Sequence, residues 1–253
     1  MAETGSSIDT LQDAPAKSFL SRLIGVFIEP GETFEDIARK PDWIAPLILL
    51  TLASLAVVET MLARIGIQRI IMQSLTLSGQ AARMDPAQLT QVVERSAGIY
   101  SKVMPVSALL GAAVFMLIVA GFGLLVLNVF FGQRAKFKQV FSVSCYANMP
   151  GILSAVMAVV VIFYGDLDAF NPRNIAPTNP GFFMNPLTTS HAVFALASSL
   201  DFITFWFLIL LAIGLSRVVG KKVKAGSIFL TYLGAWVLLV IAKVGFAMLT
   251  SPH

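Results

Sequence analysis

The chain has 253 residues, of which 57% are hydrophobic and 13% are charged. In soluble proteins about a quarter of the residues are charged, so this composition excludes an ordinary soluble domain and predicts a membrane protein. The net charge is +4, and the basic residues are clustered, which favours topology signals over nucleic-acid binding. With one cysteine and two histidines, no internal disulfide is possible and neither a metal nor a cofactor is expected.

The N-terminal part divides into a tail and an interfacial segment. Residues 1–16 are polar, and we expect them to form a disordered tail. Residues 17–42 are expected to lie on the cytoplasmic side. Within them the apolar residues of 19–28 recur at helical spacing, although this stretch contains Arg22 and is too short to cross a bilayer. The pattern predicts an amphipathic helix lying in the membrane interface.

Five apolar runs are long enough to span a bilayer at 1.5 Å per residue. They are residues 43–67, 104–131, 146–164, 192–216 and 226–249. The sequence therefore predicts an all-α integral membrane protein whose residues 43–249 form a five-helix bundle. None of the five spans is expected to be broken within the membrane.

The two connections on the predicted outer side differ in kind. In the first, Asp85 followed by Pro86 is typical of a helix start, and the apolar residues after it predict an amphipathic helix. The second, residues 165–190, is rich in proline and asparagine and is expected to be irregular.

Basic residues predict the orientation of the bundle. The N-terminal segment and the second and fourth connections carry eleven Lys and Arg residues, and the opposite side carries five, mostly in one long connection. The eleven are Lys17, Arg22, Arg39, Lys40, Arg134, Lys136, Lys138, Arg217, Lys221, Lys222 and Lys224. The N-terminus is therefore expected in the cytoplasm, and the C-terminus outside, of a bacterial inner membrane.

Four ionisable residues fall within the predicted spans: Glu59, Arg64, Asp201 and Lys243. Charges at such depth cost from about 3 kcal/mol upward, so they usually face inward and pair. The predicted orientation places Glu59, Asp201 and Lys243 at similar depths in the outer half, with Arg64 about one turn nearer the interface. We therefore expect an intramembrane ionic cluster, which either fixes helix register or forms an ion relay or a polar-ligand site.

A second polar layer is expected in the inner half of the bundle. It consists of Asn128 near the end of the second span and Asn148 at the start of the third. Interhelical hydrogen bonds are the simpler interpretation, at about 0.6 kcal/mol each, and a ligand site is the alternative. Cys145, close by, has no basic neighbour in sequence and is expected to be a buried, unreactive thiol.

Four stretches of the chain resemble the YIP-domain family, named for binding Ypt/Rab GTPases, and specifically its bacterial branch. They are "FIEPGETFEDIARKPDWIAPLIL", "GQRAKFKQVFSVSCYANMPGIL", "FNPRNIAPTNPGFF" and "LDFITFWFLILLAIGLSRVVGKK". Together with their spacing they cover residues 19–248. The last includes the acid at Asp201 and Trp206 five residues later.

The resemblance implies a five-helix membrane protein with a cytoplasmic N-terminus. Eukaryotic members of the family are trafficking factors that bind prenylated GTPases and recruit partners to Golgi and ER membranes. This sequence has neither their "DLYGP" motif nor a long segment before the first span, so GTPase binding is not carried over.

Two functions remain open from the sequence. The first is a non-catalytic scaffold that recruits protein partners or pairs with a second copy, with anionic lipid as a further candidate partner of its basic inner loops. The second is a small transporter or channel that uses the Glu59, Asp201 and Lys243 layer. An enzyme is not expected, because the sequence has no nucleophile motif, metal-ligand spacing or phosphate-binding glycine loop.

Overall fold

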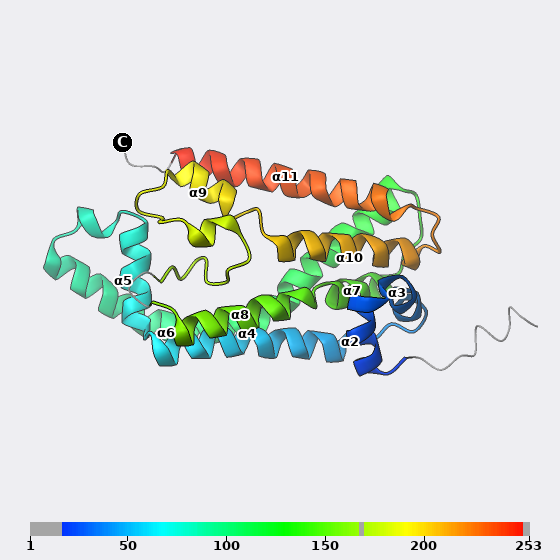
Figure 1. Ribbon diagram of the computed structural model, residues 1–253, viewed down its shortest axis with the longest axis horizontal. Helices are drawn as coiled ribbons and strands as arrows, with labels where there is room; N and C mark the ends of the chain where they lie inside the picture. The colour runs from blue at the N-terminus through cyan, green and yellow to red at the C-terminus, as the bar shows by residue number, and fades with distance from the viewer. Residues whose placement is uncertain (1–16, 167–169, 250–253) are drawn as a thin grey trace, which may run out of the picture.

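The computed structural model describes residues 17–166 and 170–249, so the expected tail at residues 1–16 lies outside the described residues (Figure 1). These ranges contain helices, turns and loops, and no strand. The helices are α2 (Phe19–Ile28), α3 (Pro30–Arg39), α4 (Ile44–Arg64), α5 (Ile67–Leu77), α6 (Pro86–Leu124), α7 (Phe137–Ala147), α8 (Pro150–Tyr164), α9 (His191–Ala197), α10 (Phe202–Val218) and α11 (Ala225–Leu249). Short 3₁₀ turns cover Ala81–Arg83 and Pro180–Phe183, and a π-helical segment, Leu125–Phe130, continues α6.

The all-α membrane architecture is confirmed. Within the described ranges, four helical stretches are long and apolar enough to cross a membrane: α4, α6 with its π-helical end, α7 with α8, and α11. A fifth crossing is reached when α9 and α10 are taken together.

The second crossing differs from the prediction in its length. The expected amphipathic helix of the first outer connection and the expected second span form one continuous helix, α6. Asp85 caps its start as predicted, because the carboxylate accepts the backbone N–H of Gln88 at 2.9 Å. Pro105 lies inside this helix without interrupting it.

The expectation of an unbroken fourth span is wrong. Helices α9 and α10 are separated by residues 198–201 and bent by 44° relative to each other. The polar residues of this break stand inside an otherwise apolar run, and they cap or terminate the helices on either side.

The two ends of the bundle differ in character (Figure 1). At one, which we call the basic end, α2 and α3 lie beside the connections 131–136 and 219–224. At the other, the loop end, α5 and α9 lie with the long connection 165–190. Helix α4 packs on α6 and α8, while α10 packs on α3, α7 and α11.

The main hydrophobic core lies toward the basic end. It joins Met116 and Leu127 of α6 and its extension to Tyr146 of α7, Leu211 of α10 and Ile228 of α11. Phe34 and Ile37 of α3 belong to the same core. The α2–α3 hairpin is therefore an integral part of the bundle.

Candidate functional site

Asp201, the acid inside the predicted fourth span, caps a helix. Helix α10 begins at Phe202, and one carboxylate oxygen of Asp201 accepts the backbone N–H groups of Ile203 at 2.8 Å and Thr204 at 3.1 Å. The first N–H groups of a helix have no partner within the helix, and in a membrane no bulk water is present to satisfy them. The break explains why an acid stands at this position.

The connection 165–190 reaches into the same break. The Thr178 hydroxyl donates to the other carboxylate oxygen of Asp201 at 2.6 Å, and the Phe202 N–H donates to the Thr178 carbonyl at 3.0 Å. Beside them the side-chain amides of Asn174 and Asn179 pair reciprocally, at 3.0 and 2.8 Å. Thr178 and Asn179 are buried, so this part of the loop is fixed against the start of α10.

Lys243 of α11 forms hydrogen bonds with residues of the same break. Its ammonium donates to the Ser198 hydroxyl at 3.1 Å and to the Ser199 hydroxyl at 2.9 Å. Asp201 and Lys243 thus both contact the α9–α10 break. Each has neutral partners there, and neither pairs with the other.

Glu59 and Arg64 lie apart from this break on α4. Glu59 is exposed, while the Arg64 guanidinium stands 5.1 Å from the ring centre of Phe163 and donates to its carbonyl at 3.3 Å. Across residues 17–166 and 170–249, no ion pair joins Glu59, Asp201 and Lys243.

Replacing Asp201 with alanine tests its capping role. We expect Asp201→Ala to lower the free energy of unfolding by about 0.5–2 kcal/mol, because α10 loses its cap and Thr178 loses its acceptor. Asp201→Asn keeps an acceptor and should cost less. Thermal unfolding of the purified protein in detergent measures both, and an alanine variant as stable as the parent would contradict the assignment.

The expected inner polar layer does not form a single cluster. The Asn128 side chain holds the connection after α6, donating to the Ala135 carbonyl at 3.2 Å and accepting the Ala135 N–H at 2.7 Å. Asn148 lies at the break between α7 and α8, where its side chain packs near Gly151. Cys145 is fully buried in the core, as expected.

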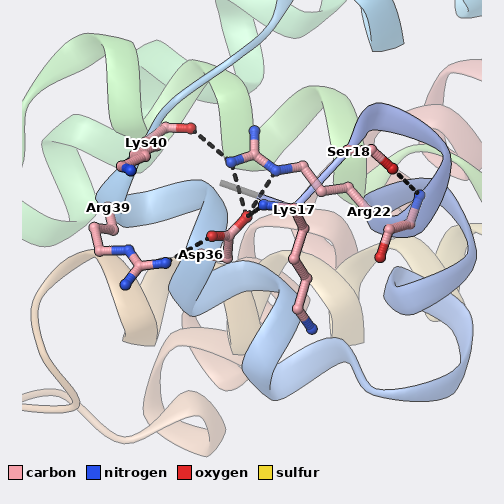
Figure 2. A network of polar contacts seen from close by, with 7 residues as sticks. Lys17, Ser18, Arg22, Asp36, Arg39 and Lys40 are labelled. Atoms are coloured by element: carbon pink, nitrogen blue, oxygen red, sulfur yellow. Dashed lines mark hydrogen bonds and ion pairs between the residues drawn. The ribbon is translucent and has the colours of Figure 1, made fainter. Parts of the chain in front are cut away.

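A buried ion-pair network at the basic end was not predicted (Figure 2). Arg22 of α2 donates to Asp36 of α3 from two nitrogens, both at 2.8 Å, and the two side chains are only 3% and 5% exposed. Arg39 and the backbone N–H of Lys17 also donate to this carboxylate, at 2.9 and 3.2 Å. Arg22 additionally donates to the Lys40 carbonyl at 3.0 Å. One carboxylate therefore joins the start of α2 to the end of α3.

The pKa of Asp36 reflects this network. Burial alone would raise it, but hydrogen bonds from Arg39 and Arg22, and the charge of Arg22, lower it below the ordinary 3.8. A carboxyl group whose pKa is lower in the folded chain than in the unfolded chain stabilises the folded state at pH values above the unfolded pKa. This stabilisation is lost as the pH drops through the folded pKa.

Acid should therefore loosen the α2–α3 hairpin. We expect thermal unfolding temperatures to fall as the pH drops below about 3.8, because Asp36 then binds a proton more readily in the unfolded chain than in the folded one. An Arg22→Met/Asp36→Leu double variant lacks this carboxyl group, so its unfolding temperature should fall less as the pH is lowered. Identical pH profiles for the two proteins would contradict the assignment.

The hairpin is also tied to α10. Glu35 of α3 accepts from Arg217 at 2.8 Å and from Lys221 at 3.5 Å. The connection 219–224 that carries Lys221 is held by the buried Ser216 hydroxyl, which donates to the Val223 carbonyl at 2.6 Å. Asn128 holds the other basic connection in the same way, so both are fixed in shape.

Sequence reasoning could have found part of this site. Arg22 was visible as a charge inside an apolar helix, which demands a partner. Its partner lies fourteen residues away in a separate helix, and no local pattern indicates it. Thr178 gave no signal, because its role depends on a loop that folds back onto α10.

The geometry assigns hydrogen-bonding and packing roles to these polar residues. In the part of the chain that the structure describes, no group of three or more His, Cys, Asp or Glu side chains is placed to hold a metal ion. The features that remain are a rigid charged surface at the basic end and polar clefts at the loop end.

Comparison with known proteins gives one result. A family model described as the Yip1 domain matches residues 24–244, which is nearly the whole chain and includes Asp36 of the network at the basic end and the α9–α10 break. No curated protein and no solved structure matches.

Proposed function

The chain belongs to the Yip1 domain family, and from this premise we propose that it is a non-catalytic membrane scaffold that recruits protein partners at its basic end. We place that end in the cytoplasm and the C-terminus outside, in the inner membrane of a bacterium. The distribution of basic residues supports this orientation.

The observation that carries the proposal is the fixed position of the α2–α3 hairpin. A surface that recruits a partner binds more tightly when its shape is already set, because less conformational freedom is lost on binding. The Arg22–Asp36 pair, the Glu35–Arg217 pair and the packing of α3 on α10 fix this surface.

The hairpin offers two kinds of exposed surface. On α2, Leu20, Ile24 and Ile28 form an exposed apolar stripe at helical spacing, which suits the lipid interface expected for this helix. On α3, Glu32 and Glu35 are exposed beside the basic connections. This mixed charged face suits a protein partner, and anionic lipid or a second copy of the chain are further candidates.

Photo-crosslinking in cells tests the proposal. A photoreactive residue at Glu32 or Lys222 should give adducts with another protein, whereas one at Phe183, which is exposed at the loop end, should not. Pulldown after crosslinking identifies the partner. Absence of adducts at both basic-end positions would count against recruitment there.

One observation favours the second candidate function, a small transporter or channel. Many transporters place their binding sites at broken helices near the middle of the membrane, and Asp201 stands at a helix break, between α9 and α10. Ion or solute uptake into reconstituted vesicles, abolished by Asp201→Asn, would support this function. If vesicles that contain the protein take up neither ions nor solutes, the scaffold function is favoured over transport.

A further inference from the structure

A pocket at the loop end is lined by two cationic side chains, those of Arg173 and Lys243. It has a volume of about 310 Å³ and lies between α9, α11 and the connection 165–190. Its polar lining consists of Asn171, Arg173, Asn174, His191, Ser198 and Lys243. Arg173 comes from the irregular loop and Lys243 from a membrane-spanning helix, so the fold brings them to one cavity from distant parts of the chain.

Neither cation has a carboxylate partner. The Lys243 ammonium is held by the hydroxyls of Ser198 and Ser199, both neutral. The backbone of Arg173 is fixed by its N–H, which donates to the Asn171 side chain at 2.9 Å, and its guanidinium forms no ion pair with any residue in the described ranges. Within residues 17–166 and 170–249, no carboxylate forms an ion pair with either of the two positive charges that border this pocket.

Carboxylates of the described residues lie in clefts that adjoin this pocket. Asp166 lines a cleft that shares Asn171, Asn174 and Pro186 with the pocket, and a second carboxylate lies in another adjoining cleft. That cleft, of about 400 Å³, shares Arg173 and Asn174 with the pocket and contains Asp201. The Asp201 carboxylate already accepts from Thr178, Ile203 and Thr204. Among the described residues that line the Lys243 pocket itself, none is acidic.

The pocket thus has the chemistry of an anion site. An unpaired charge near the hydrocarbon region is costly, and an anion bound between two cations removes that cost. Arg and Lys are the residues that proteins use most for phosphate, Arg through paired N–H groups and Lys as a point charge. The side-chain amides of Asn171 and Asn174 add neutral donors.

The rest of the lining indicates an amphiphile. Leu77, Phe194 and Phe246 form apolar walls beside the cations. Lys243 lies six residues before the end of α11, about 9 Å below it along the helix, which is a depth that a lipid head group can reach. An amphiphile can contact these apolar walls with its hydrocarbon part, which a free inorganic anion lacks.

We propose that this pocket binds the phosphate of an anionic membrane phospholipid, with Arg173 and Lys243 as its two cationic ligands. The lipid chains lie along the apolar side of the pocket. This site is independent of the recruiting role proposed for the basic end. It gives Lys243 a ligand-binding role in place of an ion pair with Asp201 or Glu59.

Lipid titration of the purified full-length protein in detergent tests the proposal. Short-chain phosphatidylglycerol should raise the unfolding temperature and appear as a bound adduct in native mass spectra. Phosphatidylcholine, whose choline group would meet the two cations, should bind more weakly. Arg173→Gln and Lys243→Met should each weaken phosphatidylglycerol binding about tenfold, and the double variant more.

Lys102→Met is the matched control, because it removes one exposed positive charge from α6, outside the pocket lining, and should leave this affinity unchanged. Arg173 is exposed on a loop, so its variant tests the site even where a change at Lys243 prevents folding. A double variant that binds phosphatidylglycerol as tightly as the parent would overturn the site. Equal stabilisation by inorganic phosphate alone would overturn the assignment to lipid.

Discussion

Asp36→Asn is expected to lower the free energy of unfolding by about 3–5 kcal/mol, the largest loss predicted for any single substitution in this chain. The asparagine removes the negative charge but leaves Arg22, which is 3% exposed, inside the protein. A buried cation without its counter-ion cannot recover the solvation it lost on folding. Thermal or denaturant unfolding in detergent measures the effect.

Two controls separate this effect from a general loss of charge. Glu35→Gln breaks an ion pair in the same helix, but Glu35 is 61% exposed, so the cost should stay below about 1 kcal/mol. The double variant Arg22→Met/Asp36→Leu replaces both charges with apolar groups and should regain most of the stability. If Asp36→Asn cost no more than Glu35→Gln, the network would not be what holds the hairpin.

Gly214→Ala is expected to lower the free energy of unfolding by about 1–3 kcal/mol. Gly214 lies where α10 meets both α3 and α7, and an added Cβ there would collide with side-chain carbons of Val143 and Phe34. Both neighbours are fully buried, so neither can move aside without disturbing the core. The expected result is a lower unfolding temperature and weaker docking of α3.

Gly234→Ala is the matched control for this substitution. Gly234 also lies within a long helix, α11, but nothing stands within 4 Å of an added Cβ. Alanine is the better helix former by about 1 kcal/mol, so stability should be unchanged or slightly higher. Equal losses at both glycines would show that close packing at Gly214 is not the cause.

The sequence predicted the elements whose signal is local. The apolar runs of α4 and α11 are long and nearly uninterrupted, so their presence followed from length and composition. The start of α6 followed from Asp85 and Pro86, which form a local cap. α2 was predicted as a helix from the spacing of its apolar residues, and its bounds are those expected.

What the sequence did not reveal depends on contacts between distant segments. The break after α9 is hidden in the sequence because the apolar residues on both sides outweigh Ser198, Ser199 and Asp201 in any average over a span-length window. The sequence singled out Glu59, Asp201 and Lys243 as charges within predicted spans. Their partners could not be read from depth alone, because hydroxyl groups and helix N–H groups from other segments also hydrogen-bond to a charged side chain.

Contacts between distant segments of the chain fix both ends of the bundle. At the basic end, a buried ion pair and a close glycine contact fix a hairpin on α10, and this supports a rigid recruiting surface. At the loop end, a broken helix and a folded-back loop border clefts whose charges are only partly compensated, and this supports a ligand site. The two proposals require that these ends face opposite sides of the membrane.

Labelling of single introduced cysteines in intact cells tests that requirement most directly. The native Cys145 is fully buried, so the parent protein should take up little of a membrane-impermeant maleimide and serves as the blank. Phe183→Cys at the loop end should be labelled from outside, whereas Glu32→Cys on α3 should be labelled only after the membrane is permeabilised. Labelling of Glu32→Cys in intact cells would place the recruiting surface outside and contradict the account.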